Sequence, residues 1–206
     1  MNATFRERRE AARRLGLDTA WRHAWPLCSD RKQRLFACAW CRRIWHRLDE
    51  LSKRTVEVVE QFVDGLATVE QMNEARSAMG YHSPGDWEHS MAWCAASKIV
   101  RVQMGRGSAD WESEAPPPDV ELRLLLDISG ASCDRDVSAN VLKWNGGCVV
   151  KVAAAIYDER AFDRMPILAD ALEDAGCDNA DILNHCREPG EHVRGCWVLD
   201  LLLGKK

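Results

Sequence analysis

The sequence has few aromatic residues apart from tryptophan, with four phenylalanines and two tyrosines beside nine tryptophans. It also lacks any run of about 18 apolar residues, which excludes a transmembrane helix of ordinary length. The N-terminal stretch "MNATFRERREAARRLG" is rich in arginine and has no apolar core of the signal-peptide type. We therefore expect a soluble, cytoplasmic protein that does not bind membranes.

Strand signals are missing as well, because no alternating apolar and polar run is bounded by hairpin turns. Helix caps, stops and apolar periodicity recur instead, which predicts an all-α fold built from short antiparallel helices. The expected helices are 29–48 with a cap at Ser29 or Asp30, 52–65 with a cap at Ser52, 68–80 with a capping box of Thr68 and Gln71, 86–104, 120–128, 149–162, 165–176 with Pro166 in the first turn, 178–187 with a cap at Asp178, and 191–204.

A change in composition divides the chain. Residues 105–119, "GRGSADWESEAPPPD", combine glycine, serine and acids with three consecutive prolines, which is typical of a linker that is semi-rigid at its proline end. We therefore predict an N-terminal helical unit over 1–104 and a C-terminal helical module over 120–206. Within the module, 129–147 shows no clear periodicity and is expected to be irregular.

The overall charge gives no preference for an anionic partner, because 28 Lys and Arg stand against 32 Asp and Glu. Residues 1–60, however, hold fourteen basic and eight acidic residues, a local +6 against −10 for the rest. Clustered Lys and Arg supply sequence-independent affinity for nucleic acid, although charge runs are more often solvated helix faces. The candidate phosphate-contacting residues are Arg31, Lys32, Arg34, Arg42, Arg43 and Arg47.

Nine cysteines in a chain expected to be cytoplasmic favour reduced thiols over disulfides. Cys38 and Cys41 have the Cys-x2-Cys spacing of a redox pair, but they lie well inside an expected helix and on its apolar arc. We interpret this pair as structural thiols of the core.

The stretch "HCREPGEHVRGCW", residues 185–197, is the densest group of histidine and cysteine. On a helix over 191–204, His192 and Cys196 would share one face, as a metal clamp requires. Leu199 and Leu203 continue the same stripe, so the favoured interpretation is core packing without a cofactor, with His192 hydrogen-bonded locally. The alternative is a tetrahedral zinc site, for which the candidate ligands are Cys177, His185, Cys186, His192 and Cys196.

The segment 155–204, with "PILADALEDAGC", "ILNHCR" and "HVRGCWVLDLLLG", resembles the C-terminal module of a family of uncharacterised planctomycete-type bacterial proteins. The stretches "SDRKQRLFACAWCRRIWHRL" and "VEVVEQFVDGLAT" resemble the opening segment of the same family. The resemblance implies the segmentation given above and a bacterial cytoplasmic origin. It supplies no catalytic residues.

Catalytic signatures are missing: the chain has no nucleophile elbow, no phosphate-binding glycine loop and no HExxH helix. We therefore expect no enzyme. The favoured function is a non-catalytic helical interaction or accessory module of a bacterial cytoplasmic complex, with a protein as its partner. The alternatives are a nucleic-acid-binding accessory subunit that uses the basic N-terminal helices and a zinc-stabilised binding module.

Overall fold

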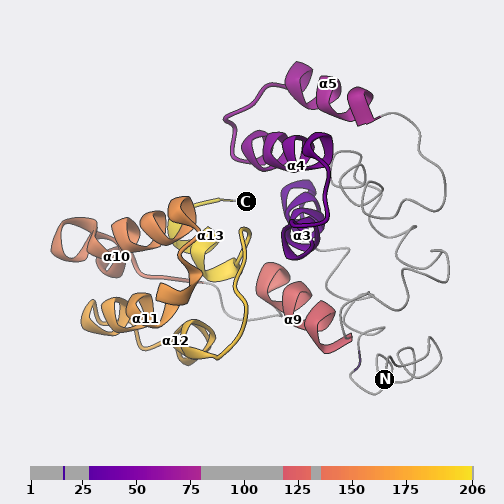
Figure 1. Ribbon diagram of the computed structural model, residues 1–206. Coiled ribbons are helices and arrows are strands. Elements are labelled where there is room, and N and C mark those ends of the chain that lie inside the picture. The colour runs from indigo at the N-terminus through magenta and orange to yellow at the C-terminus, as the bar shows by residue number, and fades with distance from the viewer. Residues whose placement is uncertain (1–15, 17–27, 80–117, 131–135, 206) are drawn as a thin grey trace. The chain divides into compact units, whose positions relative to one another are not determined.

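The computed structural model describes residue 16 and residues 28–79, 118–130 and 136–205 (Figure 1). Throughout these ranges the regular structure is helical and strands are absent, which confirms the all-α prediction. The chain divides into two compact units, Met1–Leu122 and Arg123–Lys206. The expected helix at 86–104 and the expected linker at 105–119 lie outside the described residues, except for Pro118 and Asp119, which open a helix. None of the described helices is long and apolar enough to cross a membrane.

The described part of the first unit contains α3 (Asp30–Arg43), α4 (Glu50–Val63), α5 (Val69–Met79) and the first residues of α9 (Pro118–Ser129). Helix α4 packs against both α3 and α5 (Figure 1). All residues from 34 to 41 of α3 are buried, including Cys38 and Cys41. The interpretation of these two cysteines as core residues is therefore confirmed by their burial.

Local capping chemistry sets the helix starts of this unit. The Ser29 hydroxyl accepts a hydrogen bond from the backbone N–H of Lys32, so the predicted cap of α3 is confirmed. The prediction of Ser52 as the cap of α4 is wrong, because the carboxylate of Asp49 accepts from the N–H of Ser52 at 2.7 Å and starts the helix earlier.

The capping box before α5 forms as predicted. The N–H of Thr68 donates to Oε1 of Gln71 at 2.8 Å, and the N–H of Gln71 donates to Oγ1 of Thr68 at 3.3 Å. This reciprocal pair satisfies two backbone donors that the first turn of a helix leaves without partners.

The second unit holds α10 (Ala139–Glu159), α11 (Met165–Asp174), α12 (Ala180–Arg187) and α13 (Trp197–Leu203). Helix α10 packs against α11 and α13, and α11 packs against α12. The last part of α9 (Pro118–Ser129) also belongs to this unit. The buried apolar core is made by Val141, Val149, Ala153, Ile156, Tyr157, Met165, Leu168, Ala169, Leu172, Cys177, Ile182, Leu183, Cys186, Cys196, Trp197, Val198, Leu199 and Leu202.

Three boundaries in this unit differ from the sequence-based prediction. Helix α10 starts at Ala139 after a Ser138 cap, inside the segment 129–147 that was predicted to be irregular. Within α10 the backbone is non-helical only at residues 144–147. Asn179, rather than Asp178, caps α12 through its side-chain oxygen. Helix α13 starts at Trp197, so the segment from 191 to 196, which was predicted to be helical, is not.

Candidate metal centre

Helix α9 contributes a carboxylate to the interior of the second unit. Leu124, Leu125 and Ile128 are buried, and Asp127 lies three residues after Leu124, on the same side of the helix. Its side chain is only 5% exposed. An acid in the middle of an apolar helix face has to be paired, because an isolated buried carboxylate is costly.

The other three polar groups come from α12 and from the turn that follows it. His185 stands near the end of α12, whereas His192 and Cys196 lie in the connection between α12 and α13. Gly195 has a φ of +92°, a left-handed conformation that favours glycine, and the N–H of Cys196 donates to the carbonyl of Val193 at 2.9 Å. This tight turn, rather than one helical face, brings the side chains of His192 and Cys196 together.

The four groups converge on one point. Nε2 of His185 lies 3.1 Å from Oδ1 of Asp127 and 3.3 Å from Sγ of Cys196. Nδ1 of His192 lies 2.7 Å from the same carboxylate oxygen and 4.0 Å from the same sulfur. One ligand atom from each residue can be chosen so that all lie within 4.8 Å of one another.

These separations suit a tetrahedral ion. With bonds of about 2.0–2.1 Å to nitrogen or oxygen and about 2.3 Å to sulfur, neighbouring ligand atoms of a tetrahedron lie about 3.3–3.6 Å apart. The measured distances, from 2.7 to 4.0 Å, bracket this range. The separations within the whole group stay within 4.8 Å, so binding of an ion would require His192 and Asp127 to move apart and the more distant ligand atoms to move closer.

The carboxylate is held in its ionised form. Burial raises the pKa of Asp127, but hydrogen bonds donated by His185 and His192 outweigh burial and keep the pKa below its ordinary value. The second oxygen, Oδ2, accepts the N–H of Val193 at 3.0 Å. Burial, together with the charge of Asp127, raises the pKa of the Cys196 thiol well above its usual range. A bound cation would reverse this effect on the thiol.

His192 is 8% exposed, and its Nε2 atom is buried without a hydrogen-bond partner among the described residues. A buried nitrogen left in this way costs about 1–3 kcal/mol. Apolar packing alone therefore gives no reason for a histidine at this position. The contacts of its other nitrogen, Nδ1, with Asp127 and Cys196 give a reason for a histidine here.

Of the five candidate ligands predicted from the sequence, the structure brings three together: His185, His192 and Cys196. Cys177 and Cys186 are buried in the apolar core and are not members of the group. Burial raises the pKa of Cys186 to about 12, as befits a packing thiol. The expectation that His192 bonds locally is confirmed by its contact with Cys196, four residues further on, at 4.0 Å, but its shorter contact, at 2.7 Å, is with Asp127, 65 residues away in the sequence.

Asp127 is not among the ligands predicted from the sequence. The available signal was its position in "VELRLLLDIS", where an acid interrupts the apolar side of a predicted helix. No spacing rule connects that acid to His185, so the sequence showed only that this carboxylate needed a partner.

At least three of the six residues proposed to contact phosphate, Arg31, Arg34 and Arg42, are held by contacts within the chain. Arg42 makes two hydrogen bonds with the buried Glu60, at 2.6 and 3.2 Å, and its guanidinium lies 3.8 Å from the ring centroid of Trp45. Arg31 pairs with Asp64 at 3.3 Å, and Arg34 is buried, with its guanidinium over the ring of Phe62. Among the other three, Lys32 and Arg43 are half-buried and Arg47 is exposed.

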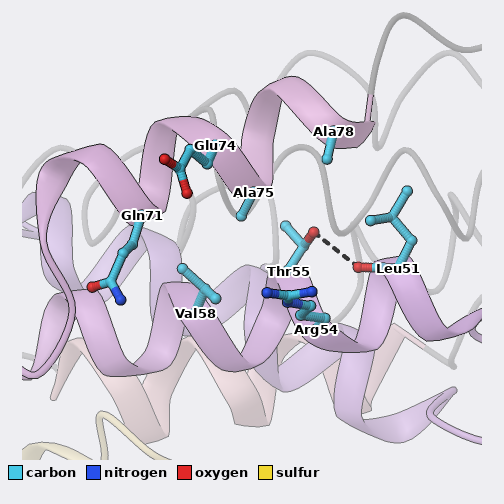
Figure 2. A pocket seen from close by; sticks show the side chains of 8 residues that line it. All are labelled: Leu51, Arg54, Thr55, Val58, Gln71, Glu74, Ala75 and Ala78. Carbon is cyan, nitrogen blue, oxygen red and sulfur yellow. Dashed lines mark hydrogen bonds between the residues drawn. The ribbon is translucent and has the colours of Figure 1, made fainter.

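A groove between α4 and α5 has a volume of about 250 Å³. Figure 2 shows Val58 and Ala75 facing each other across it, with Arg54 on one helix and Glu74 on the other. The hydroxyl of Thr55 donates to a carbonyl of its own helix at 2.9 Å. Polar groups are spread along this groove, whereas those around Asp127 converge, so the Asp127 group is the stronger candidate site.

Comparisons with protein-family models, with curated proteins and with solved structures find no match for this chain. The resemblance of residues 155–204 to a bacterial family therefore stays a prediction, and the site has to be interpreted from its own geometry.

Proposed function

We propose that the C-terminal unit binds one zinc ion through Asp127, His185, His192 and Cys196 and acts as a zinc-stabilised interaction module. The observation that carries the proposal is the convergence of four ligand groups, three of them buried and that of His185 half-buried, from helix α9 and from the stretch that spans the end of α12 and the turn after it. Packing a carboxylate, two imidazoles and a thiol around one point is costly unless they share a partner.

The chemistry of the ligands favours zinc. Imidazole and thiolate are preferred by zinc and other late transition metals, whereas magnesium and calcium take oxygen ligands. One carboxylate and one thiolate carry two negative charges, so a divalent ion would leave the buried centre neutral. Copper and iron accept parts of the same set, and metal analysis separates them from zinc.

A structural role fits better than a catalytic one. Four protein ligands complete a tetrahedron, whereas catalytic zinc usually keeps one position for water or substrate. Asp127, His192 and Cys196 are all less than a tenth exposed, which restricts access to the centre. The module is therefore proposed to hold a shape for a protein partner rather than to perform a reaction. Nucleic-acid binding by the basic helices remains the alternative, tested by salt-dependent binding of the full chain.

The test is the metal content of the full chain, purified under reducing conditions without added metal. We expect one zinc per chain by elemental analysis, and we expect cobalt substitution to give the near-ultraviolet charge-transfer band of a thiolate ligand. Cys196→Ala should lose the band and most of the zinc. Cys186→Ala is the matched control, because it removes an equally buried thiol from the same unit and should keep both.

Absence of bound metal after exposure of the reduced wild-type chain to zinc, together with no cobalt band, would overturn the proposal. If zinc stays bound to Cys196→Ala but is lost from Cys186→Ala, the ligand is Cys186 and the proposal is wrong about the cysteine. If a metal other than zinc is found at one ion per chain, the site is correct and only the identity of its ion changes.

A further inference from the structure

The four ligands are unevenly distributed along the chain. His185, His192 and Cys196 lie within one short stretch that spans the end of α12 and the turn before α13. Asp127 alone comes from α9, and its hydrogen bond to His192 joins residues 65 positions apart. A metal bound at this point would therefore connect two segments that the local chain does not connect.

The buried apolar residues of helix α9 are not among the described members of the core cluster of the C-terminal unit. That core, as far as the described residues define it, draws its buried members from residues 141–202. Leu124, Leu125 and Ile128 of α9 are buried but are not members of it. The attachment of α9 to this unit is thus of a different kind from the packing of α10 to α13.

The described contacts between α9 and the region from α12 to α13 include those of the Asp127 carboxylate and of Gly130. Both oxygens of the Asp127 carboxylate are used, Oδ1 by the two histidines and Oδ2 by the N–H of Val193. Gly130, just after the helix, has a φ of +57° and lies so close to Trp197 that an added Cβ would come within 2.6 Å of the indole. Trp197 in turn stacks near His185, with ring centroids 5.1 Å apart. The polar attachment and the metal centre are therefore the same group of atoms.

We propose that the metal ion works as a clasp that docks α9 onto α12 and the following turn, so that α9 is released when the metal leaves while α10 to α13 stay folded. This inference rests on the proposed zinc site. Three ligands from the contiguous stretch can keep an ion by themselves, whereas docking of α9 needs the fourth.

The clasp acts within the second unit. Helix α9 starts in the first unit, which ends at Leu122, and continues into the second, which starts at Arg123. All four ligands lie in the second unit. Holding Asp127 therefore fixes the C-terminal half of α9, the part of this helix that lies in the second unit.

Hydrogen exchange of the full chain, measured by mass spectrometry with zinc and after chelation, tests the clasp. We expect zinc to slow exchange in peptides covering 118–130 by about tenfold or more, while peptides covering α11 change little. Asp127→Asn, loaded with excess zinc, should leave 118–130 exchanging as in the chelated wild type. Asp119→Asn, an acid of the same helix outside the metal group, is the matched control and should behave like the wild type.

The outcomes separate the two proposals. A wild-type chain that takes up no zinc refutes the site itself. A chain that binds zinc but shows equal exchange of 118–130 with and without it keeps the site and overturns the clasp. Loss of protection in α9 and α11 together after chelation also overturns the clasp, because the metal would then stabilise the whole unit. If Asp127→Asn binds no zinc, the comparison of zinc-loaded and chelated wild type still decides.

Discussion

The two units bury charged groups in different ways. In the first, Glu60 is buried with Arg42 in a two-bond ion pair, so one negative group faces one positive group. In the second, Asp127 faces two imidazoles and a thiol, and the four groups meet at one point. An ion pair such as Glu60 and Arg42 is electrically neutral by itself. A carboxylate and a thiolate beside two neutral imidazoles need a bound cation or added protons to become neutral. The difference explains why only the second unit is proposed to need a metal.

Removal of the metal should produce the largest difference in thermal stability between the two units. At free zinc about 100 times the Kd, binding adds about 2.7 kcal/mol, which corresponds to roughly 10–20 °C in the melting temperature of a unit of this size. Calorimetry of the full chain with zinc or with a chelator should therefore move the transition of the C-terminal unit and leave that of the N-terminal helices in place. Magnesium at the same concentration is the control and should move neither. Equal shifts of both transitions would contradict the assignment.

Trp197→Ala should produce the next largest effect. Trp197 is buried, lies against Gly130 and packs near His185, so truncation removes a core anchor as well as a wall of the metal group. The expected loss is about 3–5 kcal/mol in the free energy of unfolding of the C-terminal unit. Denaturant titration followed by circular dichroism measures it. Cys186→Ala, which removes one sulfur atom from the same core, should cost clearly less, and an equal cost would show that the unit is sensitive to any core change.

Arg42→Ala should have a smaller effect, confined to the first unit. The change leaves the buried carboxylate of Glu60 without its two-bond partner, which costs about 1–3 kcal/mol. Lys53→Ala is the matched control, because Lys53 pairs with the exposed Glu50 and such pairs contribute about 0–1 kcal/mol. Thermal unfolding compares the two variants. Zinc content should be unchanged in both, and a loss of zinc in Arg42→Ala would argue against two independent ways of burying charge.

Much of the fold could be predicted from the sequence because helix starts and stops depend on neighbouring residues. The Ser29 cap, the Thr68 and Gln71 capping box and Pro166 in the first turn of α11 all form as predicted. The errors at Ser52 and Asp178 are small, because in each case a nearby residue, Asp49 or Asn179, offers the same kind of side-chain acceptor in better register.

The site could be predicted only in part, for a reason of distance along the chain. His185, His192 and Cys196 were recognised because they lie together in the sequence, although the helix expected to align His192 with Cys196 is replaced by a turn at Gly195. That turn competes with a helical stripe, and the sequence pattern alone favoured the stripe. Local sequence thus determined which groups were available, and the tertiary structure decided that Cys186 would pack into the core while Asp127 would join the histidines. The physical reason is that convergence of side chains depends on how α9 meets α12, which no periodicity within either helix encodes.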